Sequence, residues 1–269
     1  MNDDIYAMPR VVTDIGECYF YHTMELPGYG TVEGEWDLRK GASEYLGGVD
    51  FTGKRVLEIG TASGFLCFHM ENQGADVVAY DLSEKESWDI VPFSQYDHHQ
   101  AVLNRKAHIR KINNAYWLSH RVYNSGAKMV YGTVYAIPEK IGLVDISTFG
   151  SVLLHVRDPF LALQNALRLT RETVIVTDVL PRRRLPLSLL GKFTGPCMRF
   201  LPNFHKVAPK EAWWHLSPEI IVKFIGVLGF EEVDVSYHIQ RYQGKSNKLY
   251  TIVGRRTRDI QSSRLLGPG

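Results

Sequence analysis

Residues 54–84 constrain the fold most strongly, because they join two apolar strands through a glycine-rich turn and a short helix. The segment begins Lys-Arg-Val-Leu-Glu-Ile-Gly-Thr-Ala-Ser-Gly-Phe and ends Asp-Val-Val-Ala-Tyr-Asp-Leu-Ser-Glu. The elements we expect are a buried strand over 56–59, a turn over 60–64, a helix over 65–70 and a second strand over 77–80, followed by Asp81. This is the first half of a doubly wound sheet, in which ligands bind beyond the carboxyl ends of the strands.

Composition sets the limits within which this motif is interpreted. A chain of 269 residues can bury one large core, so we expect a single α/β domain with elaborations. The net charge of +2 is too small to indicate a polyanionic partner by itself. No apolar stretch reaches the roughly 20 residues that span a bilayer, which predicts no membrane partner. Three cysteines far apart, and an acidic start without the pattern of a signal peptide, predict a reducing, cytoplasmic location.

The alternation of strands and helices continues downstream. We expect a helix over 97–123, strands over 128–131, 143–149 and 173–179, and a final pair of strands over 231–238 and 249–255 joined by a polar loop over 240–248. Asp158-Pro159 and Ser217-Pro218 are typical helix starts, with a capping side chain followed by proline. The count is seven strands, of which the last two form an antiparallel hairpin.

Three segments fall outside this alternation. Residues 1–50 form a leader rich in aromatic side chains, which is either a lid over a ligand or a hydrophobic arm tied to the core. Residues 51–257 form the main domain, interrupted at 181–215 by an insertion rich in proline and bulky aromatic residues, which we interpret as a cap. Residues 258–269 are expected to be a disordered tail.

The glycine turn separates two classes of nucleotide-binding fold. Glu58-Ile59-Gly60-Thr61-Ala62-Ser63-Gly64 resembles the acid, apolar, G-x-G-x-G pattern of class I S-adenosylmethionine-dependent methyltransferases, and the terminal hairpin also resembles that fold. A dehydrogenase turn follows G-x-G-x-x-G and presents a helix N-terminus to a pyrophosphate. S-adenosylmethionine instead carries an amino group and a sulfonium, which favour a nearby acid such as Glu58. The expected fold is therefore α/β, Rossmann-like, with seven strands. Ala62 departs from the pattern, because it stands where the pattern has its middle glycine. Alanine disfavours the positive φ that glycine adopts freely.

Asp81 strengthens the cofactor prediction. It follows the second strand, where a carboxylate can accept hydrogen bonds from both hydroxyls of a ribose. The alternative role for Asp81 is to cap the residues that follow it.

A narrower resemblance rests on four motifs. They are Tyr21-His22-Thr23-Met24-Glu25-Leu26-Pro27-Gly28, Trp36-Asp37, the run from Gly53 to Gly60, and Ser151-Val152-Leu153-Leu154-His155-Val156-Arg157-Asp158-Pro159. These resemble the wobble-uridine methyltransferase-like family, named after a tRNA-modifying enzyme that completes 5-oxyacetyl or 5-methoxy uridine. The tRNA-modifying members carry an N-terminal extension that this chain lacks, so we expect a small-molecule or glycan acceptor, with tRNA as an alternative.

The resemblance implies a set of cofactor contacts. Gly60, Ala62 and Gly64 would pass beneath the methionine part and Asp81 would hold the ribose. Val134 and Tyr135 would flank the adenine, although Tyr135 is equally consistent with a core position. Phe149 and Gly150 would lie beside the sulfur that carries the methyl group.

Methyl transfer to a hydroxyl needs a base, because the hydroxyl proton must leave as the new bond forms. His155 follows the fourth strand and is the first candidate, since a neutral imidazole titrates near working pH. Its alternative role is a histidine packed under the following helix. His22 and Asp158 are further candidates for the base, and Asp158 is also the expected helix cap.

Contacts to the acceptor are expected from the leader and the cap. The residues are Tyr21, Arg39, Arg182, Trp213 and Trp214. Tryptophan stacks on a sugar or a base, and arginine binds phosphate or carboxylate. Arg39, Lys40 or an arginine of the cap would also meet the extra carboxylate of a carboxylated cofactor. Asp145 and Asp178 do not complete a metal-binding cluster, so no metal is expected.

Three functions remain open from the sequence. The first is O-methylation of a small molecule or sugar with S-adenosylmethionine. The second is methyl or carboxymethyl transfer to a tRNA wobble uridine. The third is a non-catalytic scaffold that binds the cofactor, which the set of Gly60, Gly64 and Asp81 disfavours. The oligomeric state is not indicated.

Overall fold

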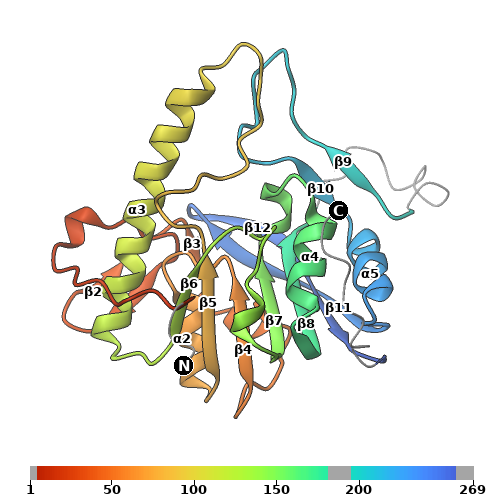
Figure 1. Cartoon of the computed structure of the whole chain (residues 1–269), viewed down its shortest axis with the longest axis horizontal. Coiled ribbons are helices and arrows are strands. Elements are labelled where there is room, and N and C mark those ends of the chain that lie inside the picture. The colour runs from red at the N-terminus through yellow and green to blue at the C-terminus, as the bar shows by residue number, and fades with distance from the viewer. Residues whose placement is uncertain (1–4, 181–194, 259–269) are drawn as a thin grey trace.

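The computed structural model describes residues 5–180 and 195–258, and an eight-stranded sheet forms its centre in the order β3-β11-β12-β8-β7-β4-β5-β6 (Figure 1). The strands are β3 (Trp36–Asp37), β4 (Arg55–Ile59), β5 (Asp76–Asp81), β6 (Lys128–Tyr131), β7 (Val144–Gly150), β8 (Thr170–Val179), β11 (Glu232–Tyr242) and β12 (Lys245–Arg255). The five strands β8, β7, β4, β5 and β6 run parallel to one another. β12 pairs antiparallel with β8, β11 with β12, and β3 with β11. This is the Rossmann-like sheet with a terminal hairpin that the sequence predicts.

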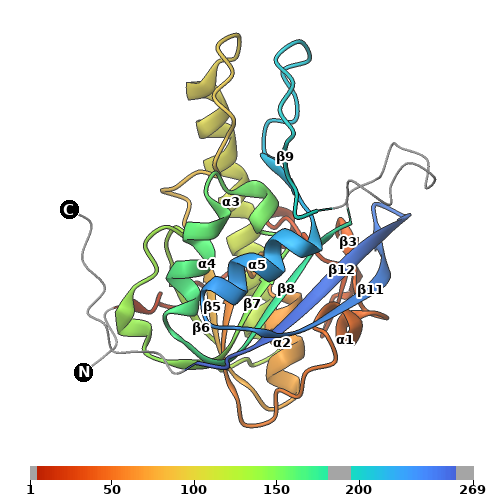
Figure 2. The same ribbon diagram turned by 90° about the vertical axis from the view of Figure 1, so that its right-hand side faces the viewer.

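Helices cover both faces of the sheet (Figure 2). The first face packs on α1 (Ala42–Tyr45), α2 (Phe65–Asn72), α3 (His98–Val122) and the leader, and the second packs on α4 (Pro159–Leu167) and α5 (Pro218–Val227). Alternate residues of β5 divide between the two cores, with Val77 and Ala79 in the first and Val78 and Tyr80 in the second. Because both faces are covered, most central residues of the parallel strands are apolar, with buried polar exceptions such as Glu58 in β4.

The two predicted helix starts are confirmed by their hydrogen bonds. Oδ1 of Asp158 accepts from the N–H of Leu161 at 2.9 Å, and the side chain of Ser217 accepts from the N–H of Ile220. A proline follows each cap at the first helical position, where its missing N–H costs no intrahelical bond.

The expected strand count and the expected loop over 240–248 are both wrong. β11 and β12 continue through these residues and are joined by a turn at Gln243 and Gly244, both with positive φ. The polar side chains near the turn occupy a sheet edge that faces water, so they pair in a ladder without being apolar. The eighth strand, β3, pairs with β11 through Trp36 and Asp37 only, which is too short to give a periodic signal.

The leader contains a short helix, η2 (Ile15–Glu17), and a small hairpin of β1 (Met24–Leu26) and β2 (Gly30–Val32). Phe20, Met24 and Leu26 are buried against the first core. Tyr21 and its neighbour Tyr19 line a cavity instead. The leader therefore both packs on the domain and reaches the carboxyl ends of the parallel strands.

The described part of the predicted cap begins at residue 195 and contains an antiparallel pair, β9 (Met198–Phe200) and β10 (Trp214–Leu216). The chain between these strands projects from the same end of the molecule as the start of α3 (Figure 2). Main-chain N–H of Val91 donates to the carbonyl of Lys210 at 2.9 Å, which links the cap to the segment before α3. Residues 181–194 and the predicted tail after residue 258 lie outside the described residues.

Candidate active site

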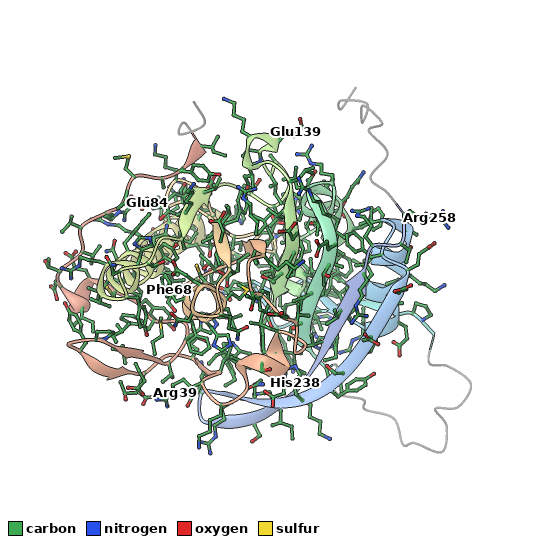
Figure 3. All side chains as sticks on the ribbon, turned by 90° about the horizontal axis from the view of Figure 1, so that it is seen from below. Arg39, Phe68, Glu84, Glu139, His238 and Arg258 are labelled. Atoms are coloured by element: carbon green, nitrogen blue, oxygen red, sulfur yellow. The ribbon has the colours of Figure 1, made fainter. Side chains whose placement is uncertain are left out.

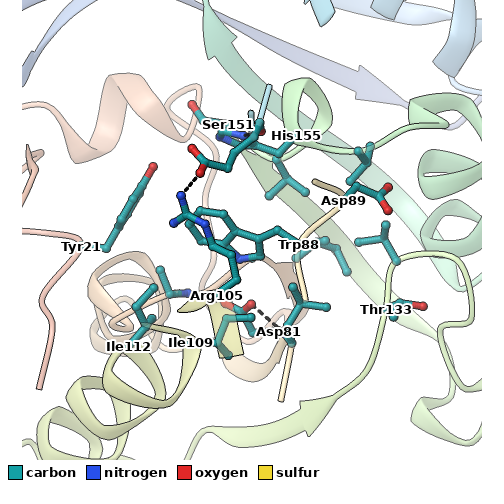
Figure 4. A pocket seen from close by; sticks show the side chains of 18 of the residues that line it. Tyr21, Asp81, Trp88, Asp89, Arg105, Ile109, Ile112, Thr133, Ser151 and His155 are labelled. Atoms are coloured by element: carbon teal, nitrogen blue, oxygen red, sulfur yellow. Dashed lines mark hydrogen bonds and ion pairs between the residues drawn. The ribbon is translucent and has the colours of Figure 1, made fainter. Parts of the chain in front are cut away.

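A cavity of about 460 Å³ opens at the carboxyl ends of the central parallel strands. Residues at the carboxyl ends of four strands, or directly after them, line it (Figure 4). They are Gly60 after β4, Asp81 at the end of β5, Gly132 to Tyr135 after β6, and Gly150 to Val152 at and after the end of β7. The cavity lies where parallel strands of a doubly wound sheet place a ligand.

The glycine turn forms the floor of this cavity. Gly60 has a φ of +80°, and a Cβ atom there would lie 2.4 Å from Cγ2 of Val152. Gly64 has a φ of +91°, and its Cβ would lie 2.4 Å from the ring of Phe68. Both positions therefore require glycine. Ala62 also takes a positive φ, +49°, within the small left-handed region open to other residues.

Asp81 holds Ala62 in this conformation. Its Oδ2 accepts a hydrogen bond of 2.7 Å from the N–H of Ala62, and its Oδ1 accepts one of 2.7 Å from the N–H of Leu82. A carboxylate has about four lone-pair sites, so acceptor capacity remains for a ligand. Burial raises the pKa of Asp81 to about 6, against the opposing effect of the two N–H donors.

Of the described residues predicted to hold the cofactor, Glu58, Gly64 and Phe149 lie outside this cavity. Glu58 and Phe149 line a second, smaller cavity of about 10 Å³, which shares Gly60 and Gly150 with the larger one as a common wall. Glu58 is only 3% exposed, and its Oε2 has no hydrogen-bond partner within the described ranges. Burial raises its pKa to about 8, so this carboxyl is largely protonated at neutral pH.

Val134 and Tyr135 both line the larger cavity beyond β6. The hydroxyl of Tyr135 donates to Oδ2 of Asp89 and accepts from the N–H of Arg157 at 2.8 Å. Tyr135 is thus fixed at the cavity wall by the segment that precedes α4.

His155 lies at the end of the short helix η4 (Leu153–His155) and lines the cavity. Its Nδ1 is bonded to the main-chain carbonyl of Glu211. A carbonyl only accepts, so Nδ1 carries the hydrogen and Nε2 keeps a free lone pair. Burial, with a smaller effect of Arg105, lowers the pKa of His155 to about 4. The ring is therefore neutral at pH 7, and it stacks on Trp88 with centroids 6.1 Å apart.

His22 and Asp158 occupy different surroundings from His155. His22 is buried behind the glycine turn, where its main-chain N–H donates to Oγ of Ser63 at 3.2 Å and its ring lies against Phe65. It is not among the described residues that line the larger cavity, and burial lowers its pKa to about 3. Asp158 is occupied as the cap of α4.

Comparison with known families identifies the domain. A sequence model described as a methyltransferase domain matches residues 37–225, which is most of the chain. The chain belongs to this methyltransferase family. A search of curated proteins found no match.

Solved structures share the fold at low identity. Magnesium protoporphyrin IX methyltransferase from Synechocystis PCC 6803, with bound S-adenosylhomocysteine, is 15% identical, with a TM-score of 0.51 and 82% of each chain covered. The N-terminal domain of EvdMO1, in the presence of S-adenosylhomocysteine and D-fucose, is 16% identical, with a TM-score of 0.52 over 88% of this chain and 91% of that one. A methyltransferase from Methanosarcina mazei is 13% identical, with a TM-score of 0.50 over 76% and 92%. The shared architecture is the class I methyltransferase fold.

The larger cavity also contains residues that were not among the site residues predicted from the sequence. They are Tyr19, Glu35, Trp88, Arg105, His108, Glu211 and Tyr242. The guanidinium of Arg105 lies 4.6 Å above the ring of Trp88 (Figure 4) and pairs with the carboxylate of Glu211. These side chains come from segments far apart in the chain. The signal that was available is the aromatic cluster at residues 19–22 of the leader.

Of the residues predicted to bind the acceptor, the structure brings Tyr21 to the cavity. Arg39 lies at the outer edge of the leader (Figure 3), where it pairs with Asp37 at 2.9 Å and with Glu25. Trp213 and Trp214 pack beside the cavity, and their indole N–H groups donate to the carbonyls of Asp89 and Arg157 at 2.6 and 3.1 Å. Arg182 lies outside the described residues.

Residues 5–180 and 195–258 contain no group of three or more histidine, cysteine or acidic side chains arranged to hold a metal. No helix in these ranges has the length and apolar character needed to cross a membrane.

Proposed function

We propose that this protein transfers a methyl group from S-adenosylmethionine to an oxygen of a small molecule or sugar. The observation that carries the proposal is the bond between Asp81 and Ala62, which places a partly unsatisfied carboxylate directly above the glycine turn. The turn fits the cofactor because Gly60 leaves no side chain between the backbone and the cavity. The family match to a methyltransferase domain supports the same reaction.

Each part of the cavity has a proposed role in holding the cofactor. The free lone pairs of Asp81 accept from the ribose hydroxyls, and Val134 and Tyr135 flank the adenine. Gly60, Ala62 and Gly150 lie beside the methionine part. Glu58 lies behind the turn, at the wall that the two cavities share, and as a largely protonated acid it does not supply the negative charge expected from the sequence at neutral pH. Gly64 and Phe149 support this wall rather than touching the ligand.

When bound, S-adenosylmethionine supplies an electrophilic methyl group on a sulfonium. The hydroxyl that accepts it loses its proton, and we propose that Nε2 of His155 takes that proton. Glu211 holds the ring through Nδ1, so the nitrogen with the free lone pair is fixed. A pKa of about 4 keeps this base unprotonated at neutral pH. His22 stays a less favoured candidate because it lies behind the turn.

The tRNA alternative has less support from the described residues. Arg39, one of the residues that could meet a carboxylated cofactor, is occupied by Asp37 and Glu25 outside the cavity. The matched family model describes a general methyltransferase domain and does not identify the wobble-uridine subfamily.

Because Cys18, Cys67 and Cys197 are free, we propose a reducing, cytoplasmic environment.

A transfer assay tests the proposed reaction. Purified protein is incubated with S-adenosylmethionine labelled in its methyl group, and with a metabolite extract or bulk tRNA in parallel. We expect label in the small-molecule fraction, attached to oxygen. Label in tRNA would favour the alternative, and no transfer to either fraction would argue for a protein that only binds the cofactor.

A further inference from the structure

Six of the polar side chains that line the cavity form two bonded groups, one around Glu35 and one around Glu211. We call the two groups together the acceptor wall, and its members are Tyr19, Glu35, Arg105, His155, Glu211 and Tyr242. They come from the leader, from α3, from η4, from the cap and from the turn end of β11. The family match assigns no role to any of them.

Glu35 sets the direction of two hydrogen bonds in this wall. The hydroxyl of Tyr19 donates to its Oε1 at 2.5 Å, and the hydroxyl of Tyr242 donates to its Oε2 at 2.8 Å. Nε2 of Gln243 makes a longer contact of 3.4 Å to Oε2. Both phenols therefore use their hydrogens on Glu35 and keep a lone pair for a ligand, while Nε2 of Gln243 also donates to the hydroxyl of Tyr242 at 3.3 Å. Burial and the bond to Glu35 raise the pKa of Tyr19 and of Tyr242 to about 12, so both phenols stay protonated.

Glu211 has the same effect on its neighbours. Its main-chain carbonyl accepts a hydrogen bond from the N–H at Nδ1 of His155, so Nε2 carries the lone pair. Its carboxylate pairs with Arg105, whose guanidinium also lies over Trp88. Tyr19, Tyr242 and Nδ1 of His155 use their hydrogens within the acceptor wall, so Arg105 is the one member with N–H groups left to donate, and Glu211 accepts from part of these. The other five members present acceptor atoms.

We propose that the acceptor is a molecule rich in hydroxyl groups and without a negative charge, with the chemistry of a sugar or another polyol, and that Glu35 determines this specificity. A wall of acceptors favours a ligand that donates. A carboxylate on the ligand has no hydrogen to donate and would meet both Glu35 and Glu211. A polyol donates from each hydroxyl and avoids this repulsion. The inference rests on the proposed function, because the wall faces the acceptor only if the Asp81 part of the cavity holds the cofactor.

Calorimetry on the full chain saturated with S-adenosylhomocysteine tests the proposal. The probes are methyl glucoside, glucosamine and glucuronate, which differ mainly in charge, at up to about 1 mM, the upper end of common KM values. We expect methyl glucoside and glucosamine, which both donate hydrogen bonds, to bind at least about tenfold more tightly than glucuronate, which corresponds to about 1.4 kcal/mol.

Variants locate the effect at Glu35. Glu35→Gln keeps the shape but frees one phenol hydrogen, so affinity for methyl glucoside should fall at least about tenfold. The affinity for S-adenosylhomocysteine should stay unchanged. Glu25→Gln, in the same leader but paired with Arg39 at the surface, is the matched control and should bind both ligands as the wild type does.

Three outcomes would overturn the proposal while S-adenosylhomocysteine still binds. They are binding of glucuronate as tight as that of methyl glucoside, no binding of any probe, and unchanged methyl glucoside affinity in Glu35→Gln. Failure of S-adenosylhomocysteine itself to bind would instead refute the proposed function, so the two failures are distinguishable.

Discussion

The N–H of Ala62 donates to Oδ2 of Asp81 at 2.7 Å, although the two residues are 19 positions apart in the chain. The bond ties the glycine turn after β4 to the end of β5, and it stabilises the left-handed conformation of Ala62. It also explains how alanine is accommodated at a position where the sequence pattern has glycine. Asp81 therefore has two roles in this account, one in the fold and one in holding the cofactor.

Ala62→Gly should stabilise the protein by up to about 1 kcal/mol, because glycine enters the left-handed region without the steric cost that alanine bears. Urea unfolding measures the change. Ala107→Gly, at an exposed position within α3, is the control and should destabilise by about 1 kcal/mol. A loss of stability in Ala62→Gly as large as that of the control would contradict the assigned backbone conformation.

Glu58 should make the protein less stable as pH rises. Burial raises its pKa from 4.5 to about 8 in the folded state. Its favourable contribution is therefore complete below the unfolded value and is lost as pH rises through the folded one. Relative to Glu58→Gln, the wild type should lose on the order of 2 kcal/mol of unfolding free energy between about pH 5 and about pH 8. Parallel stability curves for the two proteins would show that Glu58 is not buried as a neutral acid.

His155→Ala should lower kcat by about 100-fold or more, because a general base commonly contributes that much. The affinity for S-adenosylhomocysteine should not change. His99→Ala, at an exposed position in the first turn of α3, serves as the control. Since burial lowers the pKa of His155 to about 4, its contribution should be constant around neutral pH and be lost only as pH falls through about 4. Full activity of His155→Ala would exclude it as the base.

The affinity for S-adenosylhomocysteine should fall as pH drops below about 6. Burial places the pKa of Asp81 near that value, and protonation removes lone pairs that the ribose hydroxyls need. The loss should approach tenfold per pH unit at lower pH. Asp81→Asn should bind weakly and without this pH dependence. An affinity in the wild type that is constant from about pH 7 to about pH 5 would mean that Asp81 does not contact the ligand.

Much of the fold was predictable because its signals are local. The bounds of β6 and the caps Asp158 and Ser217 follow from a few neighbouring residues. The ladder over 240–248 was missed because polar strands at a sheet edge lack an apolar pattern. β3 was missed because its two residues pair with a strand about 200 positions later, as Trp36 and Tyr242 show.

The residues of the cavity also differ in whether neighbouring sequence predicts their position. Gly60, Ala62 and Asp81 lie on one strand–turn–helix–strand unit, so sequence spacing places them together. Glu35, Arg105 and Glu211 meet only after the leader, α3 and the cap have packed on one another. Trp213 was expected to contact the acceptor, but its indole instead holds the carbonyl of Asp89 beside the cavity. No local pattern distinguishes these two uses of tryptophan.

Calorimetric titration with S-adenosylhomocysteine tests the central claim most directly, using the wild type, Asp81→Ala and Asp76→Ala. Asp76 is the matched control, because it is an aspartate at the opposite end of the same strand and is exposed. The account predicts tight binding by the wild type and by Asp76→Ala, and a loss of at least about tenfold in Asp81→Ala, or about 1.4 kcal/mol. No binding by the wild type, or equal affinities for all three proteins, would contradict it.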